Sequence, residues 1–160
     1  MLIFLRRLFL VAATLGSVCS PAFAANTSAP VLYNSLSKAA PELNPQVLQS
    51  ALSAMQCAVN NGASQARHLA VIDYSMPSTA RRLWIFDLTS KKLVLRELVA
   101  HGQNSGENFA TRFSNSEGSF QSSLGLFRTR ESYQGANGYS LRMDGLEPGI
   151  NDRARDRDIV

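Results

Sequence analysis

Histidine and cysteine are scarce in this 160-residue chain, which contains two of each. The sequence has no H-E-x-x-H or C-x-x-C pair, no G-x-x-x-x-G-K-[ST] phosphate loop and no dinucleotide-binding glycine fingerprint after a predicted strand. With so few imidazole and thiolate ligands, a dedicated zinc site is not expected. The sequence therefore argues against the common nucleotide-dependent and zinc-dependent enzymes, and no cofactor is implied.

Charge and apolar length argue against two further classes of partner. The formal net charge is +4, and the residues after position 24 hold 14 basic and 12 acidic side chains, a charge of +2. Nucleic-acid binding requires a clustered basic face, which so mild a balance does not indicate. After residue 24 no stretch approaches the roughly 20 apolar residues of a membrane-spanning helix, so we expect no membrane span there.

The first 24 residues have the three-part pattern of a secretory signal peptide. Arg6 and Arg7 precede the apolar run "LFLVAATLGSV", and Pro21 and the small-x-small triplet "AFA" follow it. We expect cleavage after Ala24, a periplasmic or secreted mature chain, and a fold that does not include residues 1–24. At this length a single domain is expected.

Cys57 is the one cysteine that remains after such cleavage, so the mature chain offers no internal disulfide. On a helical wheel it lies opposite Leu48, away from the apolar stripe. An activated nucleophile would need a nearby histidine or another group that lowers its pKa, and His68 is eleven residues further along the chain. The alternative is a small side chain packed against a neighbouring element, and the usual burial of free cysteine favours it.

The pattern along the mature chain predicts one helix followed by strands. Residues 25–43 mix Pro, Ser, Asn and Ala with little periodicity, which predicts a linker-like lead with about one helical turn. An amphipathic helix is predicted at about 45–60, with Asn44 as its N-cap and proline at its first position. Residues 69–160 are rich in β-branched and aromatic runs, which predict strands, including a β-hairpin over 83–99.

The region from 101 to 149 is polar and punctuated by glycine. Small residues permit tight turns and close approach of the backbone to a ligand, so such a region between strands favours function. Within it, "SSLGLFRT" and "GYSLRMDGL" predict short strands. Alternation in the second places Tyr139, Leu141 and Met143 on one face and Arg142 on the other.

Two acidic features of this region carry weaker signals. Asp144 and Glu147 could pair for acid–base chemistry, but their spacing does not distinguish them from solvated surface acids. The run "DRARDRD" is nearly neutral and predicts a solvated stretch. From the residues alone, the chain is predicted to be a mainly β (α+β) domain with one N-terminal amphipathic helix.

Three ordered segments resemble a known family. They are "VIDYSMPSTARRLWIFDL", "ELVAHGQNSGENFATRFSNSEGSFQSSLGLFRT" and "SYQGANGYSLRMDGLEPGINDRARDRDIV". Together they closely resemble the murein L,D-transpeptidase catalytic-domain family, which is YkuD-like, over about residues 71–160. The resemblance implies an L,D-transpeptidase-like β-sandwich and peptidoglycan stem peptides as substrate.

The resemblance also implies a mechanism. In that family a cysteine thiolate attacks a stem-peptide carbonyl, the terminal D-alanine leaves, and an amine of a neighbouring stem resolves the thioester, with a histidine as base. The resemblance places that histidine and cysteine after the apolar pair Ile159-Val160, and neither His101 nor Cys57 matches them. We therefore expect a partial domain over 44–160, truncated at its C-terminus, without catalytic residues of its own.

Substrate contacts are expected in the loops that are present. If the groove of the family is retained, we expect "HGQNSG" and "QSSLG" to line it, with Ser122, Ser123 and Arg142 as polar contacts. Serines and glycines that only shape turns are an equally weighted alternative. Two functions follow: an exported cell-wall protein of the L,D-transpeptidase type, or a non-catalytic envelope module that binds peptidoglycan or another envelope protein.

Overall fold

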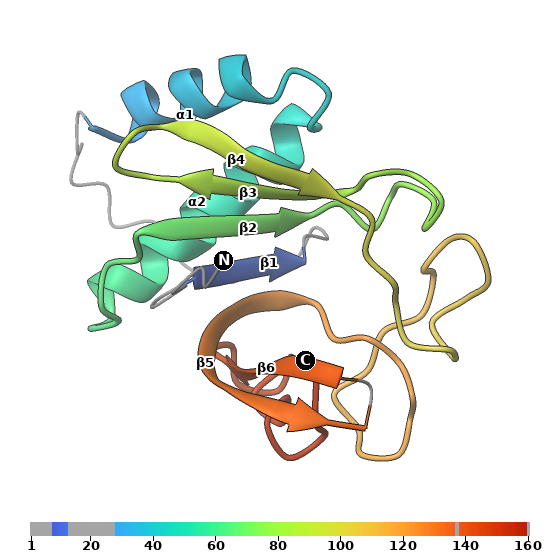
Figure 1. The fold of residues 1–160 in the computed structure, drawn as a ribbon. Helices are drawn as coiled ribbons and strands as arrows, with labels where there is room; N and C mark the ends of the chain where they lie inside the picture. Colours follow the sequence, from blue (N-terminus) through green and yellow to red (C-terminus); the bar gives the residue numbers. More distant parts are fainter. Residues whose placement is uncertain (1–7, 13–27, 137, 160) are drawn as a thin grey trace.

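The computed structural model describes residues 8–12, 28–136 and 138–159, with the backbone alone for 8–12, 28 and 29. These residues form one six-stranded sheet in the order β4-β3-β2-β1-β5-β6, together with helices α1 and α2 (Figure 1). The mainly β (α+β) class is confirmed. The β-sandwich implied by the family resemblance remains a prediction, since all the described strands belong to this single sheet.

Helix α2, Pro45–Asn60, has the bounds that the sequence predicted. Asn44 Oδ1 accepts a hydrogen bond from the backbone N of Gln46 at 2.9 Å, which satisfies one of the free N–H groups at the start of the helix. Leu48 and Ala51 are buried on its inner face. Local capping and the apolar stripe therefore agree, and the prediction is confirmed.

Helix α1, Ser28–Ala39, takes the place of the linker-like lead that was predicted there. Leu36 is fully buried, and Leu32 and Ala40 pack in the same cluster, so the apolar residues recur every four positions. The run is too short to be a strong signal in a single sequence. Packing against α2 and β4 stabilises the helix, and the linker prediction is wrong for these twelve residues.

Three strands form one side of the sheet, and the first two of them contribute buried side chains to the main core. They are β2 (His68–Ile72), β3 (Leu83–Asp87) and β4 (Lys92–Glu97), each antiparallel to the next. Trp84 and Phe86 alternate with half-buried residues along β3 and pack against the helices. The predicted hairpin over β3 and β4 is confirmed.

Strands β5 (Gly125–Gly135) and β6 (Gly138–Gly145) form a further antiparallel pair. The register between them shifts between Thr129 and Ser132, and β5 curves away from the rest of the sheet in Figure 1. A bulge of this kind bends and twists the strand that carries it. Both strands predicted from the sequence are present, and β5 is longer than expected.

The alternation predicted along β6 is only partly visible as burial. Met143 is 6 % exposed, whereas Tyr139 is 77 % exposed. Tyr139 pairs with Gln134 close to the hairpin turn, beyond the apolar cluster that covers Met143.

Strand β1, Leu8–Ala12, lies in the middle of the sheet. It is parallel to β2, from Leu8↔His68 to Ala12↔Ile72, and antiparallel to β5. The sequence placed these residues in a signal peptide outside the fold, and the structure differs from that expectation at these five positions. Cleavage after Ala24 remains a prediction.

Candidate functional site

The polar loops gather at one end of the sheet. The β2–β3 connection, 73–82, and the β4–β5 connection, 98–124, both lie there (Figure 1). The backbone N of Ser78 donates to Asn108 O at 2.7 Å and ties the two loops together. "HGQNSG" lies in the longer loop, and "QSSLG" comprises the last four residues of that loop and the first residue of β5.

Arg82 is the centre of this loop cluster. Its side chain is fully buried, and it donates to Met76 O at 2.9 Å and twice to Val99 O, at 3.2 and 3.0 Å. The guanidinium also lies 4.9 Å from the centre of the Tyr74 ring. Burial lowers the pKa of Arg82, while nearby Tyr74 and Asp73 raise it in part. One buried cation therefore joins the β2–β3 loop to the end of β4.

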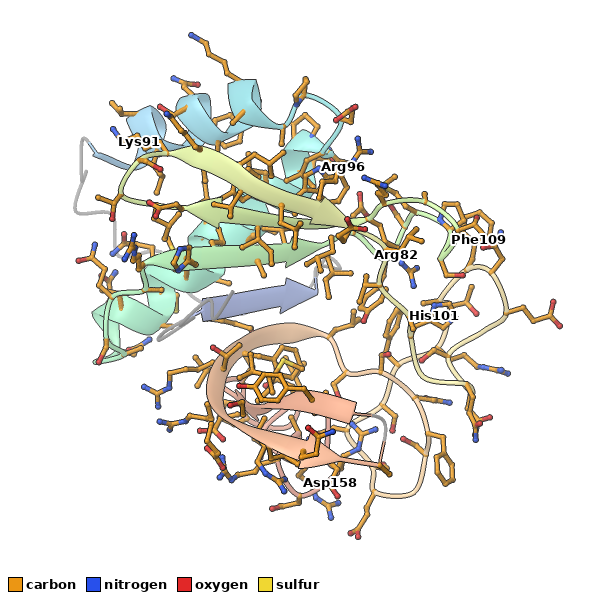
Figure 2. All side chains as sticks on the ribbon, viewed as in Figure 1. Arg82, Lys91, Arg96, His101, Phe109 and Asp158 are labelled. Carbon is orange, nitrogen blue, oxygen red and sulfur yellow. The ribbon has the colours of Figure 1, made fainter. Side chains whose placement is uncertain are left out.

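His101 lies directly beside Arg82 (Figure 2). Its Nδ1 is 2.7 Å from Arg82 Nη2, and its Nε2 is 3.1 Å from Gly106 O. Because a guanidinium can only donate, Nδ1 accepts and Nε2 carries the proton that Gly106 O receives. Both ring nitrogens are engaged, so His101 holds the "HGQNSG" turn in place and offers no free lone pair for a base.

Ser122 joins the two predicted groove segments. Its Oγ accepts from the backbone N of Gly102 at 2.9 Å, and its own N donates to Ser105 Oγ at 2.8 Å. Tyr74 also hydrogen-bonds Ser122; burial raises the pKa of this tyrosine, and the Ser122 bond and Arg82 offset part of that rise. Ser122 is half-buried at the junction, so it shapes the turn and still reaches the surface.

Ser123 is placed differently, with 4 % of its surface exposed. Its hydroxyl donates to Ser114 O at 2.9 Å and accepts from Arg157 Nη1. The hydroxyl is thus engaged as both donor and acceptor inside the protein. This arrangement favours the turn-shaping role that the sequence analysis left open for Ser123.

Arg157 was missed by sequence reasoning, which predicted a solvated stretch for "DRARDRD". Besides Ser123, its guanidinium donates to Ser114 O, to Ser119 Oγ at 2.9 Å and to Gln121 O at 2.8 Å. Burial lowers its pKa. The prediction of a solvated side chain is wrong for this residue, because the chain after β6 turns back over the "QSSLG" loop. A single sequence contains no pattern that predicts such a long-range contact.

Two buried residues hold this turned-back segment to the sheet. Asn151 is fully buried and donates to Leu124 O at 2.9 Å and Leu126 O at 3.1 Å, and Ala154 is also fully buried. The segment therefore has a packed inner side, with its charged residues around it.

Arg142 lies on β6, away from the two predicted serines. Its guanidinium is 4.4 Å from the centre of the Tyr133 ring, its Nη1 donates to Asp158 Oδ1 at 2.9 Å, and its Nε is 3.8 Å from Glu131 Oε1. No hydrogen bond among the described residues joins it to either serine. The three predicted contacts are therefore not one cluster, and their role in substrate binding remains a prediction.

An open depression of about 370 Å³ lies next to Arg142. It is lined by Arg130, Glu131, Asp144 and Arg155. Asp144 accepts from Arg155 Nη1 at 3.0 Å and also from Arg130. Burial raises the pKa of Asp144, but the hydrogen bonds from the two arginines outweigh it, so the pKa is lowered. Acids and arginines balance one another here.

The structure gives Glu147 a structural role. Its Oε2 accepts from the backbone N of Leu126 at 2.7 Å, and its own N donates to Asn151 Oδ1 at 2.9 Å. Since Asp144 is bound to arginines, the two acids have separate partners. The structure thus offers no support for pairing them in acid–base chemistry.

Cys57 lies on α2 and is disulfide-bonded in the full chain. The expectation of no internal disulfide concerns the chain after residue 24 and stays a prediction. Asn61 Nδ2 is 3.4 Å from its Sγ. A sulfur in a disulfide is not a nucleophilic thiolate. In the ranges that the structure describes, no group of three or more His, Cys, Asp or Glu side chains is placed to hold a metal, and no helix is long and apolar enough to cross a membrane.

A family model described as the L,D-transpeptidase catalytic domain matches residues 39–160. This match covers α2, strands β2 to β6 and every loop of the cluster around Arg82. The chain therefore belongs to the L,D-transpeptidase catalytic-domain family, as its motifs predicted. Searches of curated proteins and of solved structures found no match.

Proposed function

We propose that this chain is an exported cell-wall protein that binds peptidoglycan stem peptides with the loops at the end of its sheet. Family membership over residues 39–160 carries the proposal, because stem peptides are the substrate that a murein L,D-transpeptidase domain implies. The signal-peptide pattern of residues 1–24 supports a periplasmic or secreted location. Ser122 is the predicted contact best placed for this role, since it is half-buried and joins both groove segments.

We further propose that residues 1–160 do not perform the acyl transfer themselves. The reaction needs a thiolate that attacks the stem carbonyl and expels D-alanine, with a base that takes the thiol proton and delivers a proton to the leaving amine. Cys57 is in a disulfide, and both ring nitrogens of His101 are bound within the protein.

The same observation favours a second candidate function. A domain without an available nucleophile can still bind, so the alternative is a non-catalytic envelope module whose role is binding alone, whether or not a longer product carries the chemistry. Its partner would be peptidoglycan or another envelope protein.

Sedimentation with isolated sacculi tests the binding. We expect the full chain to pellet with sacculi above the level of an unrelated exported protein, and excess soluble stem tetrapeptide to release it. Ser122→Ala should weaken retention several-fold, whereas Ser116→Ala, at an exposed position of the same loop, should not. Absence of retention would refute peptidoglycan binding, and retention unaffected by tetrapeptide would point to another envelope component.

Mass spectrometry tests the chemistry. After incubation of the reduced chain with a stem tetrapeptide, we expect no acyl adduct on Cys57 and no release of D-alanine. An adduct would overturn the non-catalytic assignment. Sequencing the gene past codon 160 completes the test, because a downstream histidine and Ser-x-Gly-Cys motif would assign the chemistry to the longer product.

A further inference from the structure

The position of β1 is unusual for an N-terminal segment with a signal-peptide pattern. Its five residues pair with five of β2 on one side and four of them pair with β5 on the other. In the part of the chain that the structure describes, no other strand joins β2 to β5. The segment Leu8–Ala12 therefore connects two otherwise separate pieces of sheet, β4-β3-β2 and β5-β6.

The parts of β2 and β5 that flank β1 are largely buried, although β5 becomes exposed further along its length. On β2, Leu69 and Val71 are 0 % exposed, and on β5, Leu126 and Phe127 are 2 % and 1 % exposed. Without β1, the facing backbone N–H and C=O groups of both strands would lose their partners in apolar surroundings. The space between β2 and β5 is thus shaped for an extended apolar segment.

The predicted processing site lies outside this strand. β1 ends at Ala12, α1 begins at Ser28, and the predicted cut follows Ala24. Cleavage there would sever the connection to the domain and leave the strand itself intact. We propose that the space between β2 and β5 is a strand-binding groove for the chain's own segment Leu8–Ala12, which stays bound through backbone hydrogen bonds after cleavage.

This inference goes beyond the proposed function and shares with it only the predicted cleavage after Ala24. The groove takes an uncharged pentapeptide, "LFLVA", parallel to β2 and antiparallel to β5. Its failure would leave binding to peptidoglycan untouched, since the loops around Arg82 lie in another part of the fold.

A cleavable full-length chain tests the groove. A specific protease site is inserted after Ala24 in a Cys57→Ser background, so that no disulfide can hold the peptide. After cleavage we expect peptide 1–24 to co-elute with the domain in gel filtration, and a labelled synthetic peptide of residues 6–14 to exchange into the complex. Release of the peptide without rebinding would overturn the proposal.

Two variant peptides distinguish strand addition from unspecific adhesion. A central strand uses its N–H groups on one side or the other, so Leu10→Pro in the labelled peptide removes a ladder bond and should weaken binding at least about tenfold. Leu10→Val keeps both the backbone and the apolar side chain and should bind within about threefold. Equal binding of the proline peptide would also overturn the proposal.

Discussion

Replacing Arg82 should loosen the whole loop cluster at the end of the sheet. Its guanidinium makes four hydrogen bonds, to Met76 O, twice to Val99 O and to His101 Nδ1. Hydrogen bonds to a charged group contribute about 1.5–3 kcal/mol each, and the acceptors left behind are partly buried. Relief of the guanidinium's own desolvation offsets part of the loss. We expect Arg82→Met to lower the free energy of unfolding by about 3 kcal/mol.

Urea unfolding followed by tryptophan fluorescence measures this change. Trp84 is the one tryptophan, is fully buried and lies two residues from Arg82, so its emission reports on this part of the core. With a slope of about 1.5–2 kcal/mol per molar urea, the midpoint should fall by roughly 1.5–2 M.

The neighbouring arginine provides the matched control. Arg81 is exposed, and Arg81→Met should change the unfolding free energy by no more than about 0.5 kcal/mol. Urea midpoints of the two variants within 0.5 M of each other, roughly the spread seen among surface substitutions, would refute the reasoning about the buried Arg82 side chain. Hydrogen exchange should also become faster at the amides of 99–106 in Arg82→Met alone.

Three further predictions concern other contacts of the same loops. Arg157→Met should lower the free energy of unfolding by about 2–3 kcal/mol in urea, against under about 1 kcal/mol for Arg153→Met, which breaks an exposed ion pair. Equal losses would contradict the role given to the hydrogen bonds of Arg157. The pKa of Asp144 is lowered in the folded protein, so its contribution to stability is present above pH about 4 and is lost as pH falls through the folded pKa. Asp144→Asn should therefore flatten the decline of the urea midpoint between pH 5 and 2. An unchanged slope would contradict this role of Asp144. Gly102→Ala would bring a Cβ against Phe120 O and should lower the melting temperature by several degrees, whereas an unchanged melting temperature would show that the loop can shift freely.

Several features were predictable from the sequence because their causes are local. Helix α2 has its N-cap, its first-position proline and its apolar stripe within 17 residues, from Asn44 to Asn60. The hairpin of β3 and β4 likewise combines two apolar runs with a short polar turn. The ordered motifs of 71–160 were sufficient for the family, since a resemblance of this kind does not depend on knowing which atoms touch.

The site was less predictable, because its important contacts join distant parts of the chain. Arg157 donates hydrogen bonds to Ser123 and its neighbours, which lie 34 or more residues away in the sequence. These bonds attach to the loop a stretch that was predicted to be solvated. His101 could not be read as a structural group until Arg82 and Gly106 were placed on its two nitrogens. A hydrogen-bond partner decides what a polar side chain does, and the sequence does not state the partner.

By itself, the sequence determined the family, the mainly β class and the elements whose capping and periodicity are contained in a short stretch. Only the tertiary structure decided that Leu8–Ala12 is a central strand, that 28–39 is a helix and that Cys57 is not a free thiol. The physical reason is the same in each case. A short apolar segment or a lone cysteine has no preferred role until another part of the chain buries it, pairs its backbone or bonds its sulfur.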